Sequence, residues 1–331
     1  MPPLVAFVGT GGTIASLGTD PFDLLDYGNN GKRLQAEEIV ARLPSCDGLA
    51  GILPVRFKTV ESTAITPDDW LALAALCTTL ADGTPELAGI VVGHGTSTLE
   101  ETAYCLSLTL KLRIPVVLVG SQRPLSGVSS DAPLNLIDAI RVAVEPNSHG
   151  RGVLVVLNGE IHDARDVAKR SNFRLQAFQT PEFGVLGHVD GETVRYHRRT
   201  ERLHTLRSEF AIPDIGAMPR VDIAYSYAGS DGTAIHAFAN AGARGIVLAG
   251  FGPGMGTPAE TKALEDVIAR GVVALQSSRV GSGCVLDSAR HRAAGILPAD
   301  NLSPQKARIL LGLALARTND PAAIRRIFAT Y

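Results

Sequence analysis

The chain repeats short, uninterrupted apolar runs separated by longer stretches of mixed character. These runs, rich in Val, Ile and Leu, do not alternate with polar residues, which is typical of parallel strands covered by helices on both faces. The pattern predicts strands at residues 4–9, 55–60, 89–93, 115–119, 152–157, 221–227, 245–249 and 271–276.

Helix signals lie between many of these runs. Thr66-Pro67-Asp68-Asp69 supplies an N-cap, a proline at the first helical position and an acidic first turn. Ser303-Pro304 and Asp320-Pro321 repeat the device before the last two expected helices. The alternation of strand and helix predicts an α/β fold with parallel sheets and right-handed crossovers.

The length of the chain and a break in the pattern both indicate two domains. A chain of 331 residues exceeds one ordinary domain. Between about 178 and 220, short β-type pieces and prolines replace the alternation. We therefore expect an N-terminal catalytic α/β domain at 1–200, a linker at 201–219 and a smaller C-terminal α/β domain at 220–331.

Composition excludes several classes of partner. Apolar residues make up 45% and charged residues 19%, so a core is available and disorder is not indicated. The net charge is −2, and the strongest basic cluster, Arg290-His291-Arg292, falls far short of a nucleic-acid footprint. The first apolar run is too short to span a bilayer. We expect a cytoplasmic protein without nucleic-acid or membrane partners, although a chain trimmed of a signal peptide would look the same.

The sequence also argues against metals and cofactors. Its cysteines, which lack CxxC spacing and are expected to be free thiols, are Cys46, Cys77, Cys105 and Cys284. The glycine turn at 9–13 resembles a dinucleotide fingerprint, but Ile14 stands where the third glycine should be. We expect no metal and no cofactor.

Two of the predicted strands end at glycine turns that each present a threonine. These are Thr13, after LVAFVGTGG, and Thr96, after VVGHG. Because ligands bind at the carboxyl ends of strands in such sheets, both hydroxyls stand where chemistry is expected. Gly12 and Gly95 allow close approach of a substrate and offer backbone N–H groups to an oxyanion. A threonine-nucleophile enzyme is the leading hypothesis, with the polar segment 16–33 as its lid.

A threonine hydroxyl needs a group that removes its proton. Lys169 follows the strand at 152–157 and is expected near the same sheet edge, where desolvation lowers a lysine pKa enough for it to act as a base. An ordinary surface lysine is the alternative. We interpret His94 as structural rather than as a base.

The residues after Thr96 also have a structural interpretation. Ser97 with Glu100, or Thr98 with Glu101, fits a capping box at the start of a helix. Ser97 on this interpretation is an N-cap.

Six spaced motifs together resemble the bacterial L-asparaginase/glutaminase-asparaginase family, over about residue 4 to Tyr331. They are GTGGTIAS, HGTSTLEETAY, GSQRP, SSDAPLNL, GEIHDARDVAK and NLSPQKARILLGLAL. The resemblance implies a two-domain α/β asparaginase-like fold with a larger, flavodoxin-like parallel-sheet domain. It also implies a homodimer or homotetramer with sites at subunit interfaces, which hydrolyses a small carboxamide without metal or cofactor.

The same resemblance implies roles for individual residues. Thr13 corresponds to the primary nucleophile and Tyr27, in the lid segment, to its orienting partner. Thr96 and Lys169 correspond to the second hydroxyl and its proton acceptor. Ser62, followed by Thr63, falls where the family binds the α-carboxylate of the substrate.

Two positions depart from the family pattern. Ser97 replaces the aspartate of HGTDT, which binds the α-ammonium of the substrate. Arg290 aligns with a glutamate that reaches the same ammonium from the neighbouring subunit. Burying an ammonium without a carboxylate partner costs several kcal/mol in desolvation. The departures therefore indicate an active amidohydrolase with altered substrate recognition.

Three alternatives remain beside an asparaginase acting on asparagine or a similar substrate. One keeps the chemistry but uses an amide that lacks a free α-ammonium. Another is a non-catalytic binding protein that retains the fold. The third, a subunit of a tRNA-dependent amidotransferase, is disfavoured because the extra N-terminal domain and a basic surface are missing.

Overall fold

The computed structural model describes residues 2–46 and 48–331 and divides into two compact units. The first unit ends at Glu209 and the second comprises Phe210–Tyr331. The division lies inside residues 201–219, the segment that was predicted to be a linker. Within the first unit, the Lys111 Nζ donates to the carbonyls of Thr205, at 3.1 Å, and Ser208. Within the second, the Phe210 ring packs on the Tyr331 ring with centroids 5.3 Å apart. Both halves of this segment are therefore packed parts of their units.

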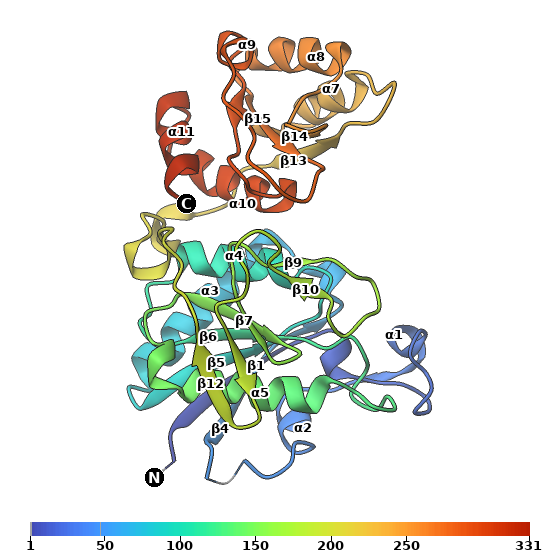
Figure 1. Cartoon of the computed structure of the whole chain (residues 1–331), viewed down its shortest axis with the longest axis vertical. Coiled ribbons are helices and arrows are strands. Elements are labelled where there is room, and N and C mark those ends of the chain that lie inside the picture. The colour runs from blue at the N-terminus through green and yellow to red at the C-terminus, as the bar shows by residue number, and fades with distance from the viewer. Residues whose placement is uncertain (1, 47) are drawn as a thin grey trace. The chain divides into compact units, whose positions relative to one another are not determined.

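The first unit is built on a mixed eight-stranded sheet with the order β12-β11-β8-β7-β6-β5-β1-β4 (Figure 1). The strands β4, β1, β5, β6 and β7 pair in parallel, and β7, β8, β11 and β12 pair antiparallel. Their bounds are β1 Leu4–Gly11, β4 Gly51–Val60, β5 Leu87–Gly93, β6 Val116–Val119, β7 Val153–Leu157, β8 Glu160–Asp163, β11 Gly187–Asp190 and β12 Thr193–Tyr196.

The parallel part of this sheet has the flavodoxin-like order 2-1-3-4-5 when its strands are counted along the chain. From β1 the chain continues to β4 on one side and afterwards to β5 on the other. The strand order therefore reverses between β1 and β5, and ligand sites in doubly wound folds lie outside the carboxyl ends of the strands at such a point.

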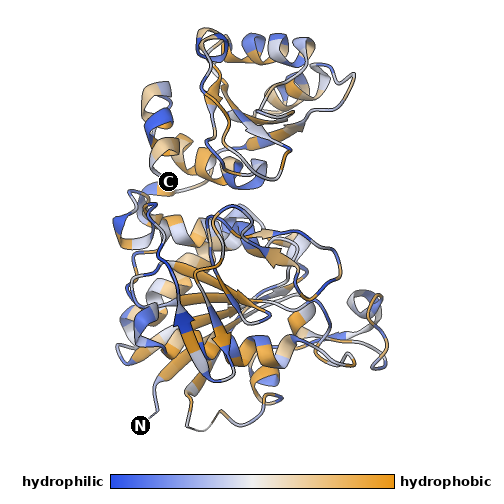
Figure 2. Cartoon of the chain, viewed as in Figure 1, coloured by the Kyte–Doolittle hydropathy of each residue, from blue (hydrophilic) through white to orange (hydrophobic). Residues whose placement is uncertain are grey.

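Helices cover both faces of the sheet, as the continuous apolar runs require (Figures 1 and 2). On one face, Leu136 and Ile140 of α5 and Ile39 of α2 share a buried cluster with Phe7 and Val91 of the strands. Figure 1 shows α3 and α4 on the opposite face. The bounds are α2 Ala36–Val40, α3 Pro67–Gly83, α4 Leu99–Thr109 and α5 Ala132–Val144.

Short elements lie in the connections between these strands and helices and at the end of the first unit. They are η1 Thr13–Ala15, β2 Ser16–Leu17, α1 Tyr27–Asn30, β3 Lys32–Arg33, η2 Ser62–Ala64, η3 Pro146–Ser148, β9 Ala168–Lys169, β10 Phe178–Gln179 and η4 Thr205–Arg207. The segment 16–33 is thus not an open loop, because β2 and β3 pair antiparallel and bring its two ends together.

The second unit has a four-stranded parallel sheet in the order β13-β14-β15-β16. Ile235 of α7 and Leu264 and Val267 of α8 pack in one cluster with Ile246 and Leu248 of β14. The bounds are α6 Ile212–Ile215, β13 Val221–Tyr225, α7 Thr233–Asn240, β14 Gly245–Gly250, α8 Pro258–Ile268, β15 Val273–Ser278, α9 Ala289–Ala293, β16 Leu297–Pro298, α10 Pro304–Leu315 and α11 Pro321–Thr330.

The predicted fold class is confirmed, and so are the expected helix starts. Thr66 caps α3 with a reciprocal capping box, and Ser303 and Asp320 cap α10 and α11 through their side chains. The antiparallel extension β8-β11-β12 was not predicted, because its short strands carry polar residues that break the apolar pattern.

The ends of β1 and β5 touch through backbone alone. A Cβ placed on Gly12 would lie 2.2 Å from the Cα of Gly95, and one on Gly95 would lie 2.9 Å from the Cα of Gly12. On its other side, β1 approaches β4 just as closely, since a Cβ on Gly11 would lie 2.3 Å from the Val60 carbonyl oxygen. Only glycine permits these contacts, and Gly12 also has a φ of 78°.

We expect Gly12→Ala to be strongly destabilising. The positive φ with a ψ of −172° costs about 1–3 kcal/mol for a residue with a Cβ, and the overlap with Gly95 adds about 1–3 kcal/mol. Gly150→Ala is the matched control, because Gly150 has a φ of 68° but no atom within 4 Å of an added Cβ. Urea unfolding should show a clearly larger loss for Gly12→Ala, and equal losses would contradict the close contact.

Candidate active site

The first hydroxyl pair lies where β1 ends. Gly12 turns the chain into η1, and the Ser16 hydroxyl donates to the Gly12 carbonyl at 2.9 Å, which closes the turn. Thr13 is the first residue of η1, and its Oγ1 lies 2.9 Å from the phenolic oxygen of Tyr27. Both side chains are half-buried. The structure therefore brings together the two residues that were predicted to act as a pair.

Tyr27 belongs to the segment 16–33, which we call the lid. The antiparallel pairing of Ser16 with Arg33 closes the base of the lid, and the Leu34 N–H donates to the Ala15 carbonyl at 2.7 Å just beyond it. Tyr27 begins the four-residue helix α1 in the middle of the lid. Its position therefore depends on how the lid is held.

The second hydroxyl pair lies where β5 ends. Thr96 is buried, and its Oγ1 accepts a hydrogen bond from the Lys169 Nζ at 2.7 Å. Lys169 lies on β9, which pairs with β10 in a short hairpin. Its backbone N–H donates to the Glu100 Oε2 at 3.0 Å. Glu100 thus ties the lysine strand to the first turn of α4, the helix that follows Thr96.

The charge of Lys169 is set by two opposing effects. Burial lowers the pKa of Lys169 below its ordinary value, and the nearby Glu100 carboxylate acts in the other direction. A lysine with a lowered pKa releases its proton more readily, so this side chain is suited to act as a base toward the Thr96 hydroxyl.

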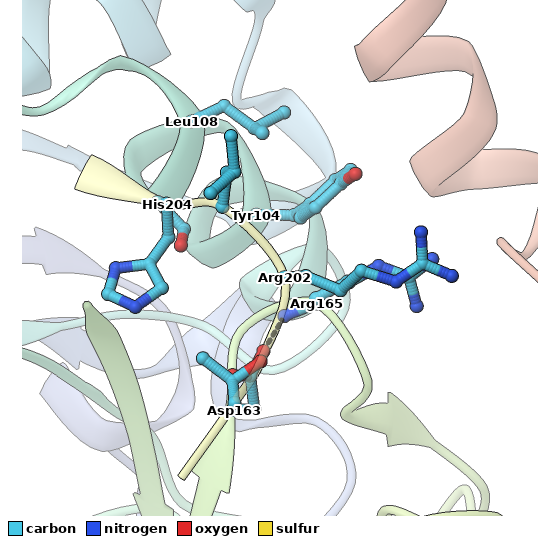
Figure 3. Close-up of a pocket in the computed structure, with 9 residues that line it drawn as sticks. Tyr104, Leu108, Asp163, Arg165, Arg202 and His204 are labelled. Carbon is cyan, nitrogen blue, oxygen red and sulfur yellow. Dashed lines mark hydrogen bonds between the residues drawn. The ribbon is translucent and has the colours of Figure 1, made fainter. Parts of the chain in front are cut away.

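The turn that leads to Lys169 is held by charged groups. The Arg165 N–H donates to the Asp163 Oδ1 at 2.6 Å, and the Arg165 guanidinium bonds the Asp166 carboxylate at 3.1 Å. Asp163 and Arg165 also line a small pocket with Tyr104, Leu108, Arg202 and His204 (Figure 3). None of the predicted site residues lines this pocket. We interpret this cluster as a structural support that holds the turn between β8 and Lys169.

His94 is structural, as expected. The Trp70 indole N–H donates to the Thr102 hydroxyl at 2.9 Å, and that hydroxyl lies 3.0 Å from the His94 Nε2. The His94 Nδ1 lies 2.8 Å from the Gly95 carbonyl oxygen. Complete burial lowers the pKa of His94 to about 4, so the ring is neutral and the Nδ1–H donates to the carbonyl. This chain of bonds fixes the Gly95 peptide.

The end of β4 joins the same edge. The Ser62 Oγ accepts the Ser97 N–H at 3.2 Å, and the Thr98 hydroxyl donates to the Ser62 carbonyl at 2.7 Å. Ser62 is buried, whereas the neighbouring Thr63 and the Ser97 side chain are exposed. Ser62, Ser97 and the two threonines therefore lie on the ends of three adjacent strands.

Two local expectations are corrected. Neither capping box forms at α4: Thr98 is the N-cap without a side-chain cap, because its hydroxyl bonds Ser62 instead. The Gly12 N–H donates to the Val60 carbonyl at 3.0 Å and is not available to an oxyanion. What Gly12 contributes here is the absence of a side chain.

Arg290 lies in the second unit, at α9, with an exposed side chain. Thr13 and Thr96 belong to the first unit. Sequence reasoning missed Glu100 as a partner of the Lys169 strand. The glutamate was visible in HGTSTLEE, but it was interpreted as a capping residue.

Within residues 2–46 and 48–331, no group of three or more His, Cys, Asp or Glu side chains is arranged to hold a metal ion. No helix in the part of the chain that the structure describes is long and apolar enough to cross a membrane.

Family models match almost the whole chain. The model "Asparaginase, N-terminal" matches residues 4–202, and "Glutaminase/Asparaginase C-terminal domain" matches residues 220–328. The two matches cover the two units and leave out only their junction and the chain ends.

Individual relatives agree with these models. A probable periplasmic L-asparaginase of Haemophilus influenzae is 37% identical over 99% of this chain and 93% of the relative. A glutaminase-asparaginase of Pseudomonas fluorescens is 37% identical over 99% and 90%. The crystal structure of a probable cytoplasmic L-asparaginase from Campylobacter jejuni superposes with a TM-score of 0.94 at 34% identity, covering 99% of this chain and all of that one. The chain therefore belongs to the bacterial L-asparaginase family, whose members are hydrolases that act on linear amides.

Proposed function

We propose that the chain hydrolyses the side-chain carboxamide of asparagine or an asparagine-like substrate through an acyl-enzyme on Thr13. One observation carries the proposal: two threonine hydroxyls stand on adjacent strand ends, each with its own partner, Tyr27 at 2.9 Å and Lys169 at 2.7 Å. Two hydroxyls with separate partners suit a reaction in two steps, in which one forms the ester and the other serves its hydrolysis.

In the first step the Thr13 Oγ attacks the amide carbon. Its proton leaves through the hydrogen bond to Tyr27, and the amide nitrogen departs as ammonia once it is protonated. For the tetrahedral oxyanion we propose the Gly95 N–H as a donor, since oxyanion donors are commonly the largest single contribution to acyl transfer. In the second step Lys169 and Thr96 remove a proton from water, which attacks the ester and releases the acid and Thr13.

A second candidate substrate is an amide that lacks a free α-ammonium. Ser97 provides no carboxylate at the position that the resemblance assigns to ammonium binding. The two neighbouring carboxylates already have partners, because Glu100 accepts the Lys169 N–H and Glu61 pairs with Arg33. An incoming ammonium would therefore have to compete for an acid that is already engaged.

For assembly we propose a homodimer or homotetramer. Exposed apolar side chains support it on the second unit, where Tyr225, Tyr227, Met255, Val280 and Leu286 are each well exposed. These residues lie on or after the ends of β13, β14 and β15, which are neighbouring strands, and large exposed apolar patches mark interfaces. For the compartment we propose the cytoplasm. The relative from Campylobacter jejuni is named cytoplasmic, whereas the relative from Haemophilus influenzae is named periplasmic.

The two threonine variants should trap different states. Thr96→Val should form the ester but hydrolyse it slowly, so that acid quenching leaves an acyl group on the peptide that contains Thr13. Thr13→Ala should carry no acyl group and lose activity by roughly a thousandfold or more. Peptide mass spectrometry reads both results. Thr13→Ser is the control that keeps a hydroxyl, and an acyl group found on Thr96 would reverse the assignment.

The pH profile should report Lys169. If neutral Lys169 is the base, the rate falls as pH drops below the pKa of Lys169, which burial lowers and Glu100 raises. Glu100→Gln removes the charge that favours the ammonium, so the acid limb of the kcat profile should move to lower pH. Glu100→Asp keeps the charge and is the control. A limb that stays in place or moves upward in Glu100→Gln contradicts the assignment of Lys169.

Ammonia release from a panel of carboxamides tests the substrate, with asparagine, glutamine, N-acetylasparagine and succinamic acid as members. If the missing carboxylate limits asparagine binding, Ser97→Asp should raise kcat/KM for asparagine by about tenfold to a hundredfold, as a charge-assisted hydrogen bond of about 1–3 kcal/mol implies. It should leave succinamic acid unimproved. Ser97→Asp/Arg290→Glu should exceed either single change. A wild-type preference for asparagine that neither variant improves would exclude the second candidate.

A further inference from the structure

The lid carries an arginine that bonds both the helix α1 within the lid and the residue that follows β4. Arg33 lies on β3, at the base of the lid. Its Nη2 donates to the carbonyl oxygen of Gly28 at 3.2 Å and also forms an ion pair with the Glu61 carboxylate. A terminal guanidinium nitrogen has two N–H groups, so it can make both bonds at once.

Gly28 directly follows Tyr27 in α1, and this helix has little stability of its own. It is four residues long, and its N-cap, Asp26, makes no side-chain cap. Isolated helices of that length do not persist in water. The orientation of Tyr27 must therefore come from contacts outside the helix, and Arg33 supplies one at the adjacent peptide.

Glu61 anchors the other end of the contact. It directly precedes Ser62, where β4 ends. Through Arg33, the helix that carries Tyr27 is therefore tied to the strand end that carries Ser62. We call these two bonds of Arg33 the tie, since they connect the lid with the main sheet.

The ion pair between Arg33 and Glu61 is exposed, which suits a contact that must break each time the lid opens. The Arg33 side chain is 28% exposed and the Glu61 side chain is 56% exposed. Exposed ion pairs contribute little to stability, because water and salt screen them. A substrate can enter only while the lid is open. A weak tie favours closure without preventing exchange.

We propose that Arg33 is a positioning residue: together with Glu61 it holds the lid closed and places the Tyr27 hydroxyl on Thr13. Arg33 touches neither hydroxyl in this arrangement. Its effect on catalysis rests on the proposed function, whereas its effect on the lid does not.

Lys32 provides a matched control next in the chain. Its Nζ pairs with the Glu38 Oε1 at 2.5 Å, on α2 and not on the lid helix. Lys32→Gln therefore removes a neighbouring exposed ion pair of the same kind and leaves the contact to Gly28 intact.

The experiment combines hydrogen exchange with kinetics on the full-length protein. Amide exchange over residues 19–31 is measured in the wild type, Arg33→Gln, Arg33→Lys, Glu61→Gln and Lys32→Gln. We expect Arg33→Gln to speed exchange and lower kcat, each by about threefold to tenfold, as the loss of an exposed charged hydrogen bond implies. Arg33→Lys should recover part of both effects, Glu61→Gln should show a smaller version of them, and Lys32→Gln should match the wild type.

The outcomes separate the lid from the chemistry. Unchanged exchange in Arg33→Gln overturns the tie, and so does an equal effect of Lys32→Gln. Faster exchange with an unchanged kcat overturns the positioning of Tyr27. A wild type that releases no ammonia from any amide refutes the proposed function, and the exchange data still decide whether Arg33 holds the lid. A matching melting temperature for Arg33→Gln excludes global unfolding as the cause.

Discussion

The whole candidate site depends on one contact between two backbones. Gly12 and Gly95 meet where β1 and β5 end, at a separation that admits no Cβ on either residue. This point is also where the strand order of the sheet reverses. Because the two turns touch, the residue after each glycine is brought to the same edge, and these residues are Thr13 and Thr96. The fold supplies the edge, and the glycines allow the two hydroxyls to share it.

The two hydroxyl pairs differ in how firmly they are held. The turn before Thr96 is held by buried bonds that run from Trp70 through Thr102 and His94 to the Gly95 carbonyl, and Lys169 is held by a partly buried bond to Glu100. Buried bonds of this kind are expensive to break, because the groups left behind lose their partners. The Thr13–Tyr27 pair instead depends on a short helix in a lid, tied by an exposed ion pair. One half of the site is fixed, and the other half can open to admit a substrate.

The sequence predicted the frame of the site better than its local bonds. Continuous apolar runs placed the strands, and glycine turns after two of them placed Thr13 and Thr96, because burial on both faces leaves a clear signal. The Gly12 N–H and the Thr98 hydroxyl were assigned wrongly, since both bond β4 or the residues that follow it, and strand neighbours cannot be deduced from local patterns. Arg33 and Glu61 gave no signal, because charged residues 28 positions apart look like ordinary surface.

The charge balance at this edge bears on what the site can hold. Two basic side chains at this edge, Lys169 and Arg33, each have a carboxylate beside them, Glu100 and Glu61. Each carboxylate is already used: Glu100 holds the Lys169 strand and Glu61 holds Arg33. In the proposed function, a substrate carboxylate would meet the hydroxyls and backbone of Ser62 and Ser97, whereas a substrate ammonium would find both Glu100 and Glu61 already bonded to other groups. An ammonium bound by Glu100 would weaken the support of the lysine strand, and one bound by Glu61 would weaken the support of the lid. A substrate with an anionic group and an amide, but no ammonium, leaves both supports intact.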